Sequence, residues 1–267
     1  MSDPEAYEVF AIRYGTKADR VRRENFIMTD AHDLPMPIDY FIWVIRNANR
    51  TIVVDTGFDH EEAAKRDRKI TRLPREGLAM LDIEAARVKD VVISHLHYDH
   101  AGTMGDFPEA TFHIQDLEMT YATGRHMCEE TFRYPYSAGH VSQLVRSLYE
   151  GRVAFHDGDE ELAPGVVVHH IGGHTMGIQC VSVMTKRGRV VLAVDTAHFY
   201  ENMEKPSPFP IVFSVADMLK GFHKMRGIAE SPRHIIPGHD PLVMQRYPAP
   251  AKDLEGVVVR LDVAPGE

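Results

Sequence analysis

The chain has 267 residues, of which 44% are hydrophobic and 26% are charged, a composition that excludes a disordered, collagen-like or coiled-coil protein. Its 30 Lys+Arg residues against 39 Asp+Glu residues give a net charge of −9 without a basic stripe, so we expect no nucleic-acid partner. No apolar run approaches the roughly 20 residues that cross a bilayer, and the start, MSDPEAYEVF, lacks the basic and apolar regions of a secretory leader. These features predict a cytoplasmic protein with no membrane partner.

Short β-branched runs and helical patterns alternate along the chain. The predicted strands span residues 40–45, 51–54, 91–94, 111–114, 166–171, 190–194 and 234–236. Apolar side chains at helical spacing predict helices over residues 77–88, 137–148 and 214–228. With no long linker and no repeat, this alternation predicts an α/β protein of one domain, residues 1–267, whose sheets are covered by helices.

Two stretches, residues 60–80 and 116–150, resemble this core least. The first carries mixed charge, which is typical of a solvated helix or loop, with a lid or a homodimer contact as the alternative. The second is rich in large side chains that we expect in the core, with a pocket wall as the alternative. These side chains are Tyr121, Met127, Phe132, Tyr134, Pro135 and Tyr136.

The numbers of cysteines and histidines lead to different predictions. The two cysteines, Cys128 and Cys180, are too few for a disulfide framework and share no CxxC spacing, so we expect two buried thiols. The 16 histidines exceed ordinary usage. Because histidine is the commonest metal ligand, this excess indicates a metal site.

The run SHLHYDHAG, residues 94–102, directly follows a predicted strand and holds His95, His97, Asp99 and His100. In an extended backbone, residues two apart point the same way, so His95 and His97 can reach one metal ion. Once the chain bends, Asp99 and His100 can face a second ion. Zn²⁺ accepts such nitrogen and oxygen donors, and each ion needs further ligands to complete its coordination.

Three more candidate ligands each follow a predicted strand. They are His174 in IGGHTMG, Asp195 after residues 190–194, and His239 in IIPGHD. Burying so many imidazoles and carboxylates together without a cation would cost on the order of several kcal/mol per group. The sequence therefore predicts two metal ions in one site.

These residues make the chain resemble the metallo-β-lactamase superfamily. The resemblance rests on HLHYDH at residues 95–100, on His174, Asp195 and His239, and on Asp55 in VVDTGFD as the usual supporting aspartate. It covers the chain from about residue 38 to residue 239, with the motifs in the right order.

The resemblance implies a four-layer αβ/βα sandwich, in which two mixed β-sheets are flanked by helices and the metals lie at one edge. It also implies a ligand set. His95, His97 and His174 would bind the first zinc, Asp99, His100 and His239 the second, and Asp195 would bridge them. Iron, manganese or cobalt could take the place of zinc.

Within the superfamily, the chain is most similar to the quorum-quenching N-acyl homoserine lactonases. The shared stretches are LPMPIDYFIWVI, FPEATFHIQDLE, VDTAH and PGHD. Lactam-cleaving members typically carry Cys where Asp195 stands. Glyoxalase-II-like members append a helical region, whereas the residues after His239 read here as a tail.

The chain departs from the lactonase pattern at two places, of which the first concerns the substrate and the second the loop that carries His174. Lactonases usually carry a tyrosine three residues after the bridging aspartate, where it hydrogen-bonds the lactone carbonyl. This chain has His198 there and Tyr200 two residues further on. We take either as the substitute donor, with a packed or solvated histidine as the alternative for His198. The stretch GGHTMGIQ replaces the common PGHTxGH but keeps His174.

Together, the ligand set and the resemblance predict a dinuclear-zinc hydrolase that opens a small-molecule lactone, an N-acyl homoserine lactone or related cyclic ester, by attack of a metal-bridging hydroxide. Asp99 would carry a proton to the leaving oxygen, and His198 or Tyr200 would stabilise the oxyanion. Several apolar side chains could line an acyl pocket, with a place in the core as the alternative. These are Met104, Phe107, Met127, Phe199 and Met203.

Three other functions fit the same ligands. One is hydrolysis of another ester, a thioester or a cyclic amide, since the zinc chemistry tolerates any polarised carbonyl. Another is an iron-dependent sulfur dioxygenase of the superfamily, which would hold one iron. The third is a metal-binding scaffold without catalysis.

Overall fold

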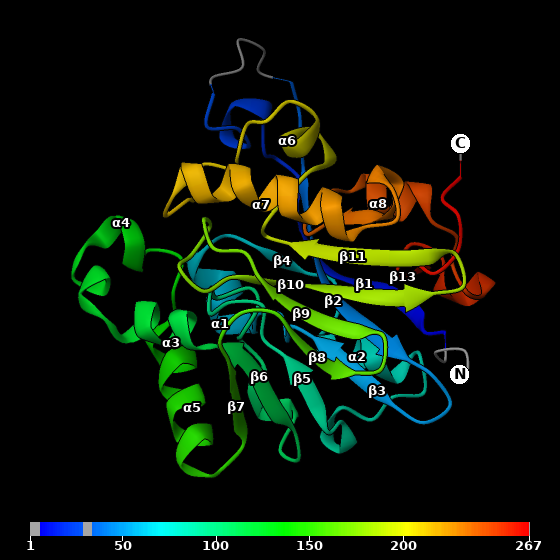
Figure 1. Ribbon diagram of the computed structural model, residues 1–267, viewed down its shortest axis with the longest axis horizontal. Coiled ribbons are helices and arrows are strands. Elements are labelled where there is room, and N and C mark those ends of the chain that lie inside the picture. Colours follow the sequence, from blue (N-terminus) through cyan, green and yellow to red (C-terminus); the bar gives the residue numbers. More distant parts are fainter. Residues whose placement is uncertain (1–5, 29–33, 267) are drawn as a thin grey trace.

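Two β-sheets pack face to face in the computed structural model, which describes residues 6–28 and 34–266 (Figure 1). Of the first residues, MSDPEAYEVF, which were compared above with a secretory leader, residues 1–5 therefore lie outside the described part. The first sheet runs in the order β13-β1-β2-β3-β5-β6-β7, with β4 paired to β1. Its strands are β1 (Glu8–Lys17), β2 (Ile38–Arg46), β3 (Thr51–Val54), β4 (Lys69–Ile70), β5 (Asp90–Val92), β6 (Thr111–Gln115), β7 (Val153–His156) and β13 (Val258–Arg260).

The second sheet runs in the order β12-β11-β10-β9-β8. Its strands are β8 (Glu160–Ala163), β9 (Val166–His170), β10 (Gln179–Thr185), β11 (Gly188–Val194) and β12 (Ile235–Pro237). Both sheets mix parallel and antiparallel pairs: β3 and β5 are parallel, for example, whereas β1 and β2 are antiparallel.

Helices cover the outer faces of both sheets, which completes the four expected layers (Figure 1). Helix α7 packs on β11, while α2 and α5 pack on β1 and β7. The helices are α1 (His60–Lys65), α2 (Pro74–Ala79), α3 (Asp116–Thr123), α4 (Glu130–Arg133), α5 (Ala138–Tyr149), α6 (Tyr200–Glu204), α7 (Val215–Ile228) and α8 (Leu242–Arg246). The predicted αβ/βα sandwich is confirmed.

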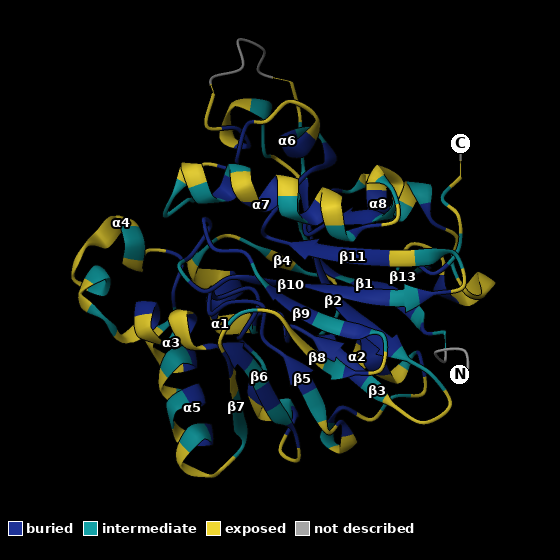
Figure 2. Ribbon diagram, in the orientation of Figure 1, coloured by how far each residue is buried: buried dark blue, intermediate teal, exposed yellow. Residues whose placement is uncertain are grey.

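Strand β2 shows how the sequence produces two cores. Side chains alternate between the faces of a strand. Phe41 and Trp43 accordingly pack in the core between the sheets, whereas Tyr40 and Ile42 pack under the helices of the first sheet. A strand buried on both faces is typically a nearly continuous apolar run. Figure 2 shows buried strands in dark blue, and β2 is buried at every position except its last.

Helix α7 illustrates how a helix covers a sheet. Met218, Phe222 and Met225 recur at helical spacing and are buried against the second sheet. Ser214 begins the helix by accepting a hydrogen bond from the backbone N–H of Asp217. The predictions for this helix and for the helix at residues 137–148 are confirmed.

The predicted helix over residues 77–88 is wrong. Helix α2 ends at Ala79, and a short 3₁₀ turn follows at Ala85–Arg87. Asp82 lies between them with φ 58°, a left-handed conformation that no α-helix contains. Leu78 and Leu81 are nevertheless buried, so the apolar pattern reports burial rather than one helix.

The residues after His239 are not a tail. Strand β13 pairs antiparallel with β1 and extends the first sheet at its edge. Val258 and Leu261 are fully buried there. A strand of three residues has too short a pattern to be recognised in the sequence.

The two unassigned stretches fold into ordered elements. Residues 60–80 contain α1, β4 and α2, and their buried Glu62 pairs with Arg66. Residues 116–150 contain α3, α4 and α5, where Tyr121 is buried but Tyr134 is 58% exposed. Cys180 is buried as expected, whereas the expectation for Cys128 is wrong because it lies exposed in a 3₁₀ turn.

The loops that leave β5, β9, β11 and β12 meet at one edge of the two sheets and carry the candidate ligands. No helix in the described part of the chain is long and apolar enough to cross a membrane.

Candidate metal centre

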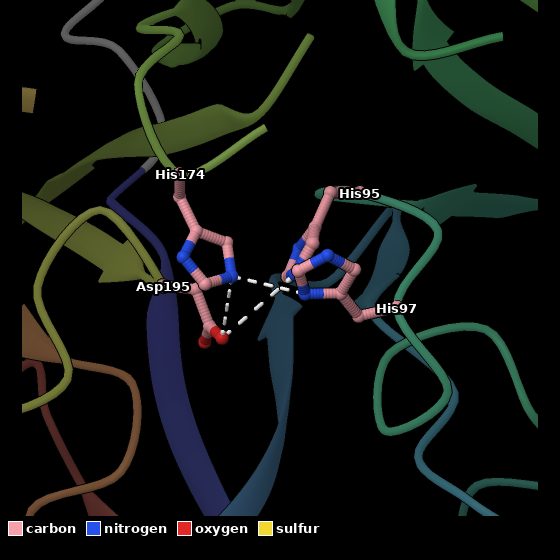
Figure 3. Close-up of side chains that lie close together, drawn as sticks. All are labelled: His95, His97, His174 and Asp195. Carbon is pink, nitrogen blue, oxygen red and sulfur yellow. Dashed lines mark hydrogen bonds and ion pairs between the residues drawn. The ribbon is translucent and has the colours of Figure 1, made fainter. Parts of the chain in front are cut away.

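The first group of candidate ligands comprises His95, His97, His174 and Asp195, all buried (Figure 3). His174 Nε2 lies 3.0 Å from His97 Nδ1 and 3.3 Å from Asp195 Oδ2. His95 Nε2 lies 3.8 Å from the same Asp195 oxygen. Three imidazoles and one carboxylate oxygen therefore converge on one point.

The second group comprises Asp99, His100, Asp195 and His239, also buried. Asp195 Oδ1 lies 2.8 Å from His239 Nε2 and 3.2 Å from His100 Nε2. Asp99 Oδ2 completes the group at 3.7 Å from His100 Nε2 and 3.8 Å from His239 Nε2. Within each group, all ligand atoms lie within 4.8 Å of one another.

Asp195 belongs to both groups. Its Oδ2 faces the imidazoles of the first group and its Oδ1 faces those of the second. A carboxylate divided in this way can bridge two cations.

The turn that presents Asp195 is strained and tightly packed. Val194 has φ 43°, which a β-branched residue rarely adopts. A Cβ on Gly238 would lie 2.6 Å from the Val194 carbonyl oxygen and 3.0 Å from Asp195 Oδ1, so the loop requires glycine there. Such strain is typical of functional sites.

The buried polar atoms of both groups fit a pair of metal ions. His95 Nε2, His100 Nε2 and Asp195 Oδ1 are buried and have no hydrogen-bond partner among the described residues. Unsatisfied buried groups of this kind are costly, and bound cations would satisfy them. Imidazole nitrogen and carboxylate oxygen suit zinc, and also iron, manganese or cobalt.

The protonation states of the first group agree with metal binding, whereas in the second group Asp195 raises the pKa of His100 and of His239 against the effect of burial. Burial lowers the pKa of His95 and of His97, which keeps both rings neutral, the form that ligates a metal. At Asp195, burial opposes ionisation, but neighbouring imidazoles, His100 first, hold the pKa of the carboxyl well below its usual range. Asp195 is therefore ionised, the form that can bridge two cations.

The second nitrogens of the ligand rings are fixed by other groups. His239 Nδ1 donates to the backbone oxygen of Asp39 at 2.7 Å, and His100 Nδ1 lies 2.7 Å from Asp55 Oδ2. Such contacts orient a ligand ring and set its tautomer. Asp55 thus has the supporting position that the resemblance implied.

Asp55 is itself tightly held. Its oxygens accept from the backbone N–H of Ser94 at 2.7 Å and from the Ser94 hydroxyl at 2.8 Å. Its backbone is left-handed, with φ 62°. Burial raises the pKa of Asp55, although His100 and Ser94 act against this rise.

The structure separates the two candidate donors to the substrate. His198 Nε2 lies 3.2 Å from Asp195 Oδ2, and its ring stacks on Phe209 at 3.7 Å between centroids with 4° between planes. Tyr200 instead faces other cavities, under the Arg246 guanidinium at 4.1 Å from its ring centroid. This placement takes Tyr200 away from the candidate ligands, because the chain enters α6 directly after Phe199.

A cavity of about 430 Å³ opens over the ligands. Members of both groups line it, and so does His198. A smaller cavity of about 150 Å³ shares His97 and His174 and is lined by aromatic rings that include Tyr121 and Phe132. Some aromatic residues of the 116–150 stretch therefore form a pocket wall, which was the alternative to a place in the core.

The apolar residues named for an acyl pocket line neither of these two cavities. Four of them are buried in the core and Met127 packs partly buried against it. The four are Met104, Phe107, Phe199 and Met203.

Sequence reasoning missed Glu118, a fully buried carboxylate in α3. Its oxygens accept hydrogen bonds from the backbone N–H of Leu96, from the Tyr136 hydroxyl and from the Thr175 hydroxyl. Leu96 and Thr175 neighbour the first ligand group in the sequence, so Glu118 joins the two loops that supply it. No local pattern marks this role, because its partners come from distant segments.

A bridged pair of His/Asp ligand groups on loops at one edge of an αβ/βα sandwich defines a metal-dependent hydrolase. Residues 37–248 match the model of the metallo-beta-lactamase superfamily, and the chain belongs to this family.

Curated relatives point in the same direction. The chain is 26% identical over 205 residues to an N-acyl homoserine lactonase of a Bacillus species. This match covers 69% of this chain and 74% of the relative. It is 30% identical over 177 residues to N-acyl homoserine lactonase AttM of Rhizobium johnstonii. This match covers 62% of this chain and 64% of the relative.

Solved structures share the fold. A quorum-quenching N-acyl homoserine lactone lactonase superposes with a TM-score of 0.73 at 22% identity, covering 91% of this chain and 95% of the other. An N-acyl homoserine lactone hydrolase with N-hexanoyl-L-homoserine bound at its catalytic metal centre gives 0.74 at 19% identity, covering 91% and 96%.

Proposed function

We propose that the protein is a dinuclear-zinc hydrolase that opens a lactone, an N-acyl homoserine lactone or a related cyclic ester. The observation that carries this proposal is the division of the Asp195 carboxylate between two ligand groups beneath one cavity. The relatives named as N-acyl homoserine lactonases support the choice of substrate. The complete second ligand group favours a hydrolase over a dioxygenase with one iron.

Two divalent cations held by these ligands would supply Lewis acidity at the substrate carbonyl and would lower the pKa of water toward neutrality. The ligands assigned to the first ion are His95, His97 and His174, those assigned to the second are Asp99, His100 and His239, and Asp195 is assigned to both.

Asp99 is the group we assign to proton transfer. Its carboxylate borders the cavity, and its backbone oxygen accepts a 2.9 Å hydrogen bond from the Tyr14 hydroxyl, which fixes the loop. From this position Asp99 takes the proton of the attacking water and delivers it to the ring oxygen that leaves as the carbonyl–oxygen bond breaks.

His198 is the group we assign to the substrate carbonyl. Burial lowers the pKa of His198 to about 3, so the ring is neutral and carries one N–H. The stacked Phe209 ring fixes its plane beside Asp195. An N–H held in this way stabilises the negative charge that develops on the carbonyl oxygen.

The proposal is tested by reconstituting metal-free protein with zinc and following acid release from N-acyl homoserine lactones, γ- and δ-lactones, aryl esters and thioesters. We expect opening of lactones above all other classes. Turnover of thioesters with none of lactones would overturn the choice of substrate. Glu109→Gln, at an exposed residue outside the cavity, serves as the control and keeps full activity.

A further inference from the structure

Two arginines, Arg20 and Arg68, line the same cavity as the metal ligands. They come from segments far apart in the sequence, one after β1 and the other just before β4. Both side chains are partly buried. The chemistry proposed at the metals uses neither of them.

Arg68 leaves part of its guanidinium without a partner. Its Nε donates to the Tyr98 hydroxyl at 3.2 Å, and its Nη1 donates to the backbone oxygens of Arg66 and Asp67. Its Nη2 makes no hydrogen bond within residues 6–28 and 34–266. The bonds that it makes fix the guanidinium against the cavity wall and leave this nitrogen available.

Arg20 is held in a similar way. Its Nε donates to Asn25 Oδ1 at 2.5 Å and its Nη2 to the backbone oxygen of Glu24 at 2.6 Å, while Nη1 has no partner in the described segments. Its guanidinium carbon lies 4.8 Å from the centroid of the Phe209 ring. Because Phe209 stacks on His198, Arg20 is linked through one ring to the face of the metal centre.

No carboxylate hydrogen-bonds either guanidinium in the described structure, since their acceptors are a phenol, an amide and backbone carbonyls. The cavity is also lined by Arg23 and Glu24, and the Glu24 carboxylate accepts from the backbone N–H of Val21. Burial lowers the pKa of Arg20, and the charge of Arg68 adds to this effect while Glu24 opposes it. Both guanidinium groups line one cavity, so an anion bound there would lie near two positive charges.

We propose that this cavity binds substrates that carry a carboxylate in addition to the scissile ester, and that Arg20 and Arg68 bind that carboxylate. Guanidinium groups with fixed, unused N–H donors match a carboxylate closely. A neutral acyl chain would leave those donors without a partner once the cavity is filled. The proposal rests on the lactone hydrolase proposed above and specifies its class of substrate.

The test uses two matched pairs of lactones. One pair is γ-butyrolactone γ-carboxylate and its carboxamide. The other is homoserine lactone N-acylated with succinate, with its terminal carboxylate free or converted to the primary amide. We expect kcat/KM to be at least about tenfold higher for the carboxylate in one or both pairs, and this preference should shrink with added salt.

Variants assign the preference to the two arginines. Arg20→Gln and Arg68→Gln should each lower the carboxylate-to-carboxamide ratio, and the double variant should bring it near one. Arg87→Gln removes an exposed arginine that pairs with Glu84 outside the cavity, and it should keep the ratio. Equal or faster turnover of the carboxamide in both pairs overturns the proposal, as does a ratio that survives in the double variant.

A binding measurement separates this proposal from the function on which it rests. If no lactone is opened, two ring-opened products are compared as stabilisers in thermal unfolding. One is N-succinyl homoserine, and in the other the succinyl carboxylate is converted to the primary amide. Stabilisation by the dicarboxylate alone, lost in Arg20→Gln/Arg68→Gln but kept in Arg87→Gln, supports the carboxylate site while the lactone function fails. Equal stabilisation, or none, overturns the carboxylate site as well. Each single variant is checked for folding in the same experiment.

Discussion

Glu118 Oε1 accepts a 2.9 Å hydrogen bond from the backbone nitrogen of Leu96, the residue between two of the candidate ligands. Glu118 also accepts from the hydroxyls of Thr175 and Tyr136. Close packing accompanies this contact, since a Cβ on Gly177 would lie 2.0 Å from the Glu118 backbone nitrogen. One buried carboxylate therefore sets the spacing of the loops that carry His97 and His174.

Replacing Glu118 should weaken metal binding. Glu118→Ala removes all three hydrogen bonds, and we expect the affinity for the metal to fall about 10- to 100-fold, the usual effect of losing a group that orients the ligands. Glu118→Gln keeps the acceptor for Leu96 and should lose less. Competition with a chelator measures the affinity. Exposed Glu109→Gln is the control, and an unchanged affinity in Glu118→Ala would refute the positioning role.

Replacing His198 should slow turnover without removing metal. His198→Phe keeps an aromatic ring stacked on Phe209 but has no N–H for the carbonyl oxygen. We expect kcat to fall about 100-fold, as for loss of one donor to an oxyanion. Metal content per chain is measured on the same sample. A variant that keeps wild-type kcat would show that His198 is only a packing residue.

Two glycines provide opposite predictions for stability. Gly173 has φ +96°, and a Cβ there would lie 2.4 Å from the Met218 backbone nitrogen at the start of α7. Gly173→Ala should therefore destabilise the fold by about 2 kcal/mol or more. Gly227 lies in α7, and a Cβ on it would have no atom within 4 Å, so Gly227→Ala should stabilise by up to about 1 kcal/mol. Denaturant unfolding measures both, and equal effects would contradict the packing described at Gly173.

The two thiols should differ in reactivity. Burial raises the pKa of the Cys180 thiol to about 12, whereas Cys128 is exposed. Only the thiolate reacts with disulfide reagents, so at pH 8 the native protein should react at Cys128 alone and the unfolded protein at both. Cys128→Ser should abolish the native reaction. Rapid labelling of Cys180 in the folded protein would mean that β10 opens locally.

The sequence predicts which His and Asp side chains gather at one edge of the sheets, because each follows an apolar strand and the loops there converge. Asp195, after the run at residues 190–194, is the clearest example. Residues whose partners lie far away in the chain carry no such signal, so Glu118 and Arg68 emerge only from the structure. Asp82 shows the opposite failure, since a single left-handed residue divides an apolar pattern that otherwise fits a helix.

Strand β13 cannot be predicted from the sequence for a related reason. Its three residues gain their strand conformation from pairing with β1 rather than from their own pattern. Tyr200 was a reasonable candidate by spacing alone, but the turn into α6 directs it toward Arg246.

The most direct test of the account counts metal ions and lactone turnover in one sample. Zinc-reconstituted protein should hold two ions per chain and open a lactone, and Asp195→Asn, which removes the bridging charge, should lose at least one ion and nearly all activity. A folded wild-type chain that retains fewer than two ions in excess zinc, or an Asp195→Asn variant that keeps both ions and full turnover, would contradict the bridged two-metal centre.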